Sequence, residues 1–527
     1  MSERDMNQPI KSIAMLPPTP LTGAHAPAWE QGLTLRVTGE PATTRRSAGV
    51  RAAWLVLILG LLLLSALTPT LGAPFVGTPN HTSGDYVETT VDIRVKIQGG
   101  YASVERSWQN GQWHFNRQWQ PLAIIRDPLD NSIKAIERNG DRFEPTANDP
   151  DLFRYGRHRR IEVAATGFRW SNRDGEWIHY HSDGRIEAYG GRNGIRAIIE
   201  ANAEGRPFIV TDHRGEPVLW FDYDEISGRL RRVYDATDRE VRYSWNGERL
   251  ETVTDLRGQD WDYGYSGDLL TSRTDPAGNT VTLSYNGQDR VVEIADELGV
   301  WRQYRYDYDK TKKQYLFRVI DGTGVETDNW YDREGALVRR EINGQTVQTV
   351  SGDETRRRMT NYAGLTTELR FDGRGNLIEV QHPDGSTRTT RWHPRWSLPV
   401  QETNENGVVT TYAYDANGNL TRKVEAVGTP AERTTEYSYD AVGNRLTERR
   451  LGDARTAEAT TTTTYDDWGN VATETDPEGN ITRFEYDVMG NVLVRTDPRG
   501  KRWTMTYDAA GNQLTDTCLL YTSLMAR

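Results

Sequence analysis

Aromatic and polar residues alternate along most of this chain after about residue 160. Tyr412 and Tyr414 are separated by a single residue, and Arg483 and Glu485 flank Phe484 in the same way. A period of two places alternate side chains on one face of a β-strand. The pattern therefore predicts short strands with one aromatic face and one polar face. The same spacing recurs at Tyr263 and Tyr265, at Tyr437 and Tyr439, and at Trp503, Met505 and Tyr507.

These strands belong to a repeat. The sequence Tyr-Asp-x-x-Gly-Asn occurs at 414–419, 439–444, 465–470, 486–491 and 507–512, and its last three copies are spaced by 21 residues. A second pattern, Asp-Pro-x-Gly, lies between copies, with Thr before it. Looser copies of the first pattern begin at Tyr223, Tyr243, Tyr265, Tyr285, Tyr306, Tyr331 and Phe371, and the second pattern is found at 274–279, 475–480 and 496–500.

Each residue of the two patterns has a physical role in a turn. The Asp carboxylate can accept a backbone N–H within the turn, and Gly can adopt a positive φ without steric cost. Proline sets φ near −65° for the first corner of the second turn. One unit is therefore predicted to hold two short antiparallel strands and two turns in about 21 residues.

One such unit cannot bury its aromatic face alone, whereas stacked units can. The range 161–514 has room for roughly 15 to 17 units and about 30 strands. Because strand twist accumulates, a sheet of that size is expected to coil into a spiral or shell. The predicted fold class is all-β, a solenoid of antiparallel hairpins.

The repeat resembles the YD-repeat, or Rhs (rearrangement hot spot), family of bacteria, with animal teneurins as distant relatives. The stretch Val91–Leu122, within a β-rich segment at 85–160, is similar to the segment that precedes the repeats in bacterial members. The resemblance implies a hollow β-shell that encloses a C-terminal toxin domain and serves contact-dependent competition or type VI-type secretion. It also implies carbohydrate binding, which is associated with the repeats of some members.

The chain departs from that family at its C-terminal end. The family's Asp-Pro-x-Gly-Leu self-cleavage segment has no match, since 497–501 ends in Lys501 and lies within an ordinary repeat. No protease residue is therefore carried over, and no PAAR-type spike domain is recognisable. The repeat pattern stops after Asp516. We expect 515–527, with the single cysteine Cys518, to be a foreign tail on an incomplete reading frame.

The N-terminal part has a different character. Residues 1–51 are proline-rich and are expected to form a disordered cytoplasmic tail. The segment 52–72 is apolar and about 20 residues long, enough to span a bilayer. Arg45, Arg46 and Arg51 precede it, which predicts a cytoplasmic N-terminus and repeats on the periplasmic or extracellular side of a bacterial inner membrane. A cleaved signal peptide and a buried helix are the alternatives. Residues 73–84 are expected to be a linker.

Composition narrows the function classes. The chain has 48 Gly and 25 Tyr among 527 residues, which the repeat explains, and its net charge is −11. An acidic balance disfavours nucleic acid as a partner. One cysteine excludes a disulfide framework and a cysteine-based zinc site.

Candidate chemistry is scarce. His179 and His181 have a spacing that could serve a metal, but no third ligand is indicated, so a solvated strand pair is favoured. The glycine-rich 190–194 lacks a phosphate-binding context and is interpreted as a hairpin turn. The basic runs 157–160 and 356–358 are interpreted as solvated edges. No catalytic, cofactor-binding or metal-binding residue is predicted, and no enzyme activity.

The sequence favours a membrane-anchored scaffold that encapsulates and delivers a toxin absent from this chain, through a secretion machinery. The alternative is a cell-surface adhesion or carbohydrate-binding protein, in which exposed Tyr and Trp stack on sugars.

Overall fold

The computed structural model describes residues 77–453 and 456–519. They form β-strands joined by tight turns, with one 3-10 turn, η1 (Arg117–Trp119). A four-stranded antiparallel sheet has the order β1-β2-β3-β4. These strands are β1 (Gly77–Pro79), β2 (Tyr86–Ile97), β3 (Gly100–Gln109) and β4 (Gln112–Phe115).

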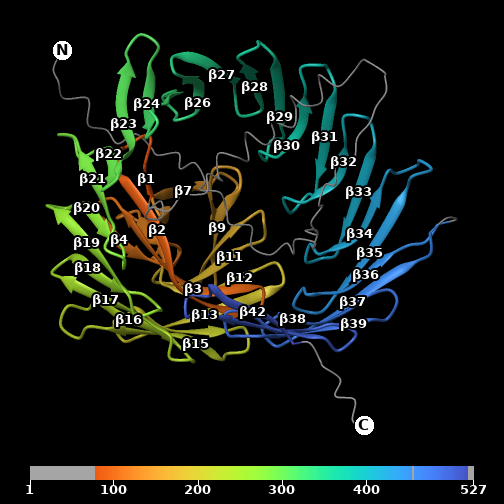
Figure 1. Cartoon of the computed structure of the whole chain (residues 1–527). Coiled ribbons are helices and arrows are strands. Elements are labelled where there is room, and N and C mark those ends of the chain that lie inside the picture. The colour runs from red at the N-terminus through yellow and green to blue at the C-terminus, as the bar shows by residue number, and fades with distance from the viewer. Residues whose placement is uncertain (1–76, 454–455, 520–527) are drawn as a thin grey trace, which may run out of the picture. The chain divides into compact units, whose positions relative to one another are not determined.

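All later strands belong to one long antiparallel sheet, in which each strand pairs with the next along the chain (Figure 1). They are β5 (Ala123–Arg126), β6 (Ile133–Arg138), β7 (Asp141–Thr146), β8 (Asp149–Tyr155), β9 (Arg159–Ala164), β10 (Gly167–Asn172), β11 (Trp177–His181), β12 (Ile186–Gly191), β13 (Gly194–Ala201), β14 (Pro207–Asp212), β15 (Pro217–Tyr223), β16 (Leu230–Asp235), β17 (Glu240–Asn246), β18 (Arg249–Thr254), β19 (Asp260–Ser266), β20 (Leu269–Thr274), β21 (Thr280–Tyr285), β22 (Val291–Asp296), β23 (Gly299–Asp309), β24 (Gln314–Asp321), β25 (Glu326–Tyr331), β26 (Leu337–Ile342), β27 (Gln345–Gly352), β28 (Arg356–Asn361), β29 (Thr366–Phe371), β30 (Leu377–Gln381), β31 (Thr387–Trp392), β32 (Pro399–Thr403), β33 (Val409–Tyr414), β34 (Leu420–Glu425), β35 (Arg433–Tyr439), β36 (Arg445–Arg450), β37 (Ala459–Tyr465), β38 (Val471–Thr475), β39 (Ile481–Tyr486), β40 (Val492–Thr496), β41 (Arg502–Tyr507) and β42 (Gln513–Leu519). The predicted all-β class and antiparallel hairpins are confirmed.

The turn of the Tyr-Asp-x-x-Gly-Asn repeat has the predicted chemistry. In the copy between β33 and β34, Oδ1 of Asp415 accepts the backbone N–H groups of Asn417 at 2.9 Å and Asn419 at 2.8 Å. Its Oδ2 accepts the Asn419 side-chain amide at 2.9 Å. Gly418 has φ +80°, a conformation that glycine adopts without steric cost. The same three side-chain bonds recur at Asp372, Asp440, Asp466, Asp487 and Asp508.

The second turn of the unit uses the same network. Asp476, between β38 and β39, accepts the backbone N–H groups of Glu478 at 3.0 Å and Asn480 at 2.8 Å. Its Oδ2 accepts the Asn480 amide at 2.9 Å, and these bonds hold the pKa of Asp476 below its usual range. The turns at Asp415 and Asp476 therefore reverse the chain through one aspartate and one asparagine.

The repeat tyrosine has a role that the sequence pattern did not indicate. The Tyr414 hydroxyl donates to the Pro399 carbonyl oxygen at 2.7 Å, fifteen residues earlier in the chain. A register shift lies directly before Tyr414, as at the end of many repeat strands. The tyrosine therefore fastens its own strand to the strand before it. The same fifteen-residue bond is made by Trp245, Tyr265, Tyr285, Tyr306, Trp392, Tyr486 and Tyr507.

The sheet curves until turns of its later strands contact turns of earlier ones. Nη1 of Arg192 donates to the Gly418 carbonyl oxygen at 2.7 Å, across 226 residues of sequence. Asn193 donates to the side-chain oxygen of Asn419 at 3.1 Å. Arg173 donates to the side-chain oxygen of Asn376 at 3.0 Å, across 203 residues. This line of contacts between early and late turns, from Arg157 to Arg239, is called the seam below.

Several predicted boundaries differ from the structure. The expected linker 73–84 contains β1, and the β-rich segment 85–160 is divided, because β2–β4 form the small sheet whereas β5–β9 join the large one. The expected foreign tail begins inside β42, where Cys518 pairs with Trp503. Backbone pairing requires no repeat motif, so the ladder continues past Asp516. The predicted disordered tail 1–51 and membrane segment 52–72 lie outside the described residues.

Candidate functional site

The concave face of the large sheet carries the repeat tyrosines and is called the tyrosine face. Its first part is covered by the small sheet, which Figure 1 shows in orange within the curve formed by β16 to β20. Tyr243 and Tyr263 are buried there, together with Ile93 and Val104 of the small sheet. This interface buries apolar and aromatic side chains of both sheets, which stabilises their association.

An ion pair is buried in this interface. Asp92 and Arg106 of the small sheet lie 3.0 Å apart, and each side chain is 3% exposed. The Tyr243 hydroxyl donates to Asp92 at 2.8 Å, and Arg106 donates to the Tyr263 hydroxyl at 2.6 Å. The hydroxyl groups of two tyrosines of the large sheet thus provide hydrogen-bond partners for the ion pair of the small sheet. A buried charge requires such partners.

A second buried contact lies beside it. Glu88 of β2 is 3.2 Å from Arg273 of β20, and the Tyr86 hydroxyl donates to Glu88 at 3.2 Å. Burial raises the pKa of Glu88, whereas the positive charges of Arg273 and Arg106 oppose the shift. Trp113 extends the row by donating from its indole N–H to the Tyr265 hydroxyl at 2.8 Å. The small sheet is therefore held by directional polar contacts as well as by apolar burial.

The later part of the tyrosine face, from β31 to β41, is less covered. Tyr412 and Tyr437 are half-buried, in contrast to Tyr243 and Tyr263. Charged groups lie among these rings: Tyr412 donates to Glu402 at 2.6 Å, and Glu402 is 3.1 Å from Arg388. This part of the face therefore presents tyrosine rings and paired charges that are available to a polypeptide packed against it.

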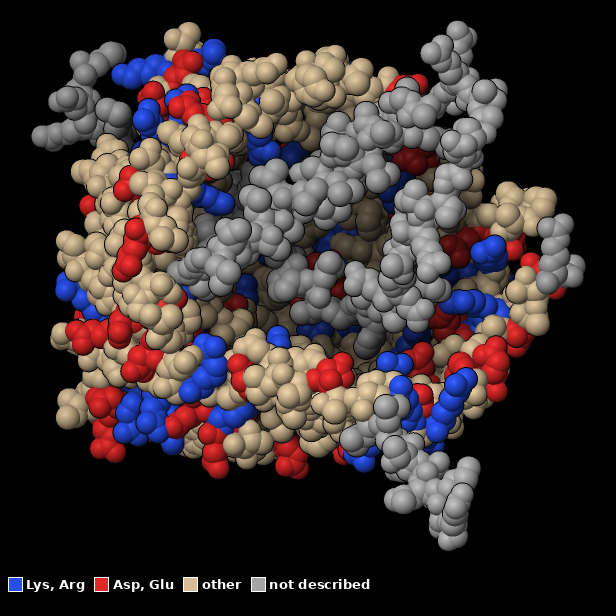
Figure 2. Space-filling view, in the orientation of Figure 1, with Lys and Arg blue, Asp and Glu red and all other residues tan. Residues whose placement is uncertain are grey.

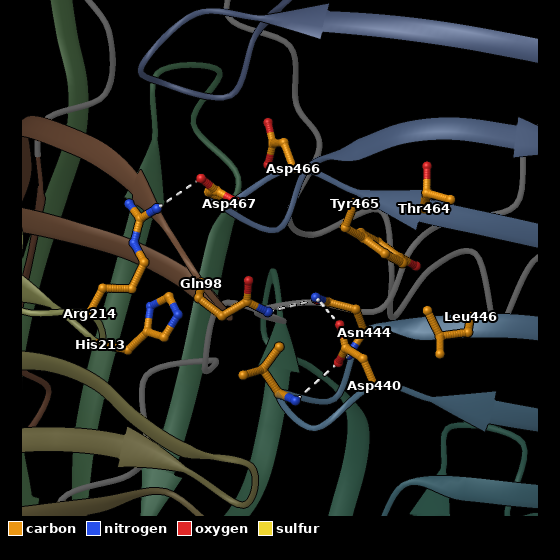
Figure 3. Close-up of a pocket in the computed structure, with 11 residues that line it drawn as sticks. Gln98, His213, Arg214, Asp440, Asn444, Leu446, Thr464, Tyr465, Asp466 and Asp467 are labelled. Atoms are coloured by element: carbon orange, nitrogen blue, oxygen red, sulfur yellow. Dashed lines mark hydrogen bonds and ion pairs between the residues drawn. The ribbon is translucent and has the colours of Figure 1, made fainter.

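The seam contains a polar cavity of about 340 Å³ (Figure 3). Gln98 at the end of β2, His213 and Arg214 from the β14–β15 turn, and the repeat turns at 440–444 and 464–467 line it. Gln98 donates to the side-chain oxygen of Asn444 at 2.8 Å, and Arg214 is 3.4 Å from Asp467. Nδ1 of His213 is buried without a hydrogen-bond partner among the described residues. The cavity joins three parts of the chain that are distant in sequence.

The basic run 356–358 is exposed, as predicted for a solvated edge, whereas Arg157 and Arg159 of the run 157–160 are half-buried and form ion pairs. Arg157 forms an ion pair with Glu354 and donates to the Asp372 carbonyl oxygen at 3.3 Å, as part of the seam. Arg356 and Arg358 both bind Glu368, at 2.6 and 3.1 Å. Arg157, Arg356 and Arg358 therefore have specific acidic or carbonyl partners. On the side of the molecule shown in Figure 2, acidic and basic side chains are interspersed.

The two histidines with metal-like spacing both lie on β11. The His179 ring packs edge-on against Trp177 at 4.9 Å, and burial lowers its pKa, as does nearby Arg169. His181 is exposed. Within 77–453 and 456–519, no group of three or more His, Cys, Asp or Glu side chains could hold a metal ion. In the same ranges, no helix has the length and apolar character needed to cross a membrane.

The similarity of this chain to known protein families lies in its repeats. The family described as RHS Repeat matches residues 261–300, 397–430, 465–501 and 490–517. A relative from Burkholderia cenocepacia (strain H111), double-stranded DNA deaminase toxin A, is 32% identical over 183 residues. The match covers 34% of this chain and 12% of that relative, so the chain spans a small fraction of the relative's length.

Two solved structures are also similar over most of the chain. The crystal structure of TcdB2-TccC3-Cdc42 has 10% sequence identity and a TM-score of 0.33, covering 89% of this chain and 32% of the other. A mutant Tc holotoxin pore of Photorhabdus luminescens has 11% identity and a TM-score of 0.21, covering 82% and 34%. The family matches fall on the strands and turns described above, from β19 to β42. The chain therefore carries RHS repeats at these positions, as the spacing of its tyrosines, aspartates and glycines predicted.

Proposed function

We propose that this chain is the shell scaffold of a toxin-delivery protein. The observation that carries the proposal is the tyrosine face from β31 to β41, which curves within an Rhs-repeat array and is left half-exposed by the small sheet. A curved face of paired charges and tyrosines can surround a polypeptide without a single tight binding pocket. The toxin relative supports this role, since its name describes a toxin and it is 32% identical over 183 residues.

The cargo is proposed to be a toxin domain encoded beyond residue 527. The described residues are proposed to act as a container rather than as a catalyst, in bacterial competition and through a secretion machinery.

Protease protection of the longer protein tests this proposal. The coding sequence downstream of residue 527 is read, and the full protein is expressed with a tag at its C-terminus. We expect the C-terminal domain to resist protease in the full protein and to be digested when it is expressed alone. Equal digestion in both forms, or a downstream sequence that holds only further repeats and a lectin-like module, would overturn the proposal and favour adhesion.

A membrane anchor at 52–72 is the second part of the proposal, with the N-terminus cytoplasmic and the repeats across the inner membrane. It rests on the apolar run and the arginines before it. Introducing Leu62→Asp and Leu63→Asp is expected to release the chain from carbonate-washed membranes. The matched control is Leu33→Asp with Leu35→Asp, which lies before the apolar run and should leave the chain in the membrane fraction. Equal partitioning of both variants and the parent contradicts the anchor.

A further inference from the structure

One edge of β2 runs along a row of repeat turns from the far end of the chain. Gln98, just after β2, donates to Asn444 at 2.8 Å. Two residues earlier, the Lys96 backbone N–H donates to the Val488 carbonyl oxygen at 3.0 Å, and its ammonium donates to the Trp468 carbonyl oxygen at 3.2 Å. Lys96 of β2 and Gln98 just after it thus contact successive repeat turns that are more than 340 residues away in sequence.

Arg239 extends this row. Its guanidinium donates to the Arg94 carbonyl oxygen at 3.2 Å and to the Ala509 carbonyl oxygen at 3.4 Å. Asp235 fixes the same guanidinium, since Nε of Arg239 donates to it at 2.8 Å. Arg239 therefore joins β2 to the last repeat turn. The row runs from the turn at 440–444 to the turn at 508–512.

The side chains of Gln98 and Lys96 approach two of the turn glycines closely. A Cβ atom at Gly469 would lie 2.6 Å from Oε1 of Gln98, and one at Gly490 would lie 3.3 Å from Cγ of Lys96. Both glycines also have positive φ, of +78° and +80°. Burial lowers the pKa of Lys96, against the opposing charge of Asp466, as expected for an ammonium group enclosed between the turns.

The opposite side of the small sheet is anchored elsewhere. The Asp92–Arg106 pair binds Tyr243 of β17 and Tyr263 of β19, and Glu88 binds Arg273 of β20. The small sheet therefore connects the early repeats, through buried ion pairs, to the last four repeat turns, through residues 94–98. Separating the long sheet along this part of the seam therefore requires one of these two sets of contacts to break, together with the direct contact of Arg214 with Asp467.

We propose that the edge of β2 is the closure element of the array: Gln98, Lys96 and the Arg239 bridge hold the last repeats against the early ones, and loss of these contacts opens the seam there. The opened unit comprises the turns from 440 to 512, while β10–β22 stay folded. Such local opening is expected where few buried contacts hold a unit. The inference does not depend on whether a toxin is carried.

Hydrogen–deuterium exchange of the full chain tests it. In a Lys96→Ala/Gln98→Ala variant, two side-chain hydrogen bonds are lost, so exchange in 440–512 should rise about tenfold or more, whereas exchange in 167–296 should stay within about twofold. The matched control, Thr89→Ala/Val91→Ala, changes exposed residues of the same strand and should leave both regions unchanged. Unchanged exchange at 440–512, or a uniform rise along the chain, overturns the proposal.

A cross-link provides the opposite perturbation if the alanine variant fails to fold. Gln98→Cys and Asn444→Cys are introduced with Cys518→Ser, which removes the native thiol, and are joined by a short bis-maleimide. The cross-linked chain should exchange about tenfold more slowly at 440–512 than the same variant with its thiols individually blocked. Failure of the two positions to cross-link, or equal exchange in the two forms, overturns the proposal.

Discussion

The Tyr414 hydroxyl donates a hydrogen bond to the Pro399 carbonyl oxygen across 2.7 Å, and the two residues are fifteen positions apart. Pro399 begins β32, and Tyr414 ends β33, which pairs with β32. The bond therefore holds two neighbouring strands together at the end where their ladder finishes. Because the same bond recurs along the sheet, the repeat tyrosine contributes a polar contact as well as an aromatic ring.

The first prediction concerns this bond. Tyr414→Phe keeps the ring but removes the donor, and a net hydrogen bond contributes about 0.5–1.5 kcal/mol. We expect the free energy of unfolding, measured in urea, to fall by about 1 kcal/mol. Tyr362→Phe is the control, because Tyr362 is 73% exposed. An equal change in the free energy of unfolding for Tyr414→Phe and Tyr362→Phe would mean that the Tyr414 hydrogen bond does not stabilise the fold.

The second prediction concerns two reasons for glycine in the repeat turns: the positive φ and the close approach of a side chain across the seam. Gly443 and Gly479 have φ +88° and +83°, so alanine at either position costs about 1–2 kcal/mol in backbone strain. A Cβ at Gly443 would also lie 1.9 Å from Nδ2 of Asn193 in the seam, whereas nothing lies within 4 Å at Gly479. Gly443→Ala should therefore destabilise the chain by about 1–3 kcal/mol more than Gly479→Ala. Thermal unfolding of the two variants, with Asn193→Ala added to the first, measures the difference. If adding Asn193→Ala recovers none of the stability lost in Gly443→Ala, the contact with Asn193 is not the cause of the larger loss.

The third prediction concerns acid stability. Hydrogen bonds from Arg356, and then from Arg358 and Arg370, lower the pKa of Glu368 from 4.5 to about 2. A carboxylate with a lowered pKa stabilises the fold above its unfolded pKa, and that contribution is lost as pH falls toward the folded value. Stability should therefore decline between about pH 4.5 and 2, and part of this decline should be absent in Glu368→Gln.

Urea unfolding at a series of pH values from 5 to about 2 checks this dependence. Glu334→Gln, at an exposed turn position, is the control and should keep the parent's decline. If Glu368→Gln and the parent lose stability in parallel as the pH falls, the arginine cluster does not set the acid response.

The fourth prediction concerns the buried ion pair. Asp92→Ala leaves Arg106 buried without its anionic partner, and breaking a buried pair in this way costs about 3–5 kcal/mol. The exposed pair of Arg142 and Glu137, with side chains 43% and 44% exposed, serves as the control. Glu137→Ala should cost no more than about 1 kcal/mol. Comparable losses in the two variants, measured by urea unfolding, would contradict a structural role for the pair.

The local units of this protein were predictable from its sequence. Alternating aromatics predicted the strands, and Asp, Gly and Asn at set positions predicted the turns, since these features depend on residues that are close in the chain. Asp415, Gly418 and Asn419 make the expected turn because backbone geometry restricts which residues can reverse the chain in so few positions. The antiparallel order followed from the short turns.

Contacts between distant segments were decided only by the tertiary structure. The pairing of Arg157 with Glu354, and of Gln98 with Asn444, depends on how far the sheet curves before its turns meet again. That curvature is the sum of small twists over many strands, and no local pattern encodes the sum. The ion pair of Asp92 and Arg106 is buried for the same reason: only the coiled sheet brings Tyr243 and Tyr263 to it.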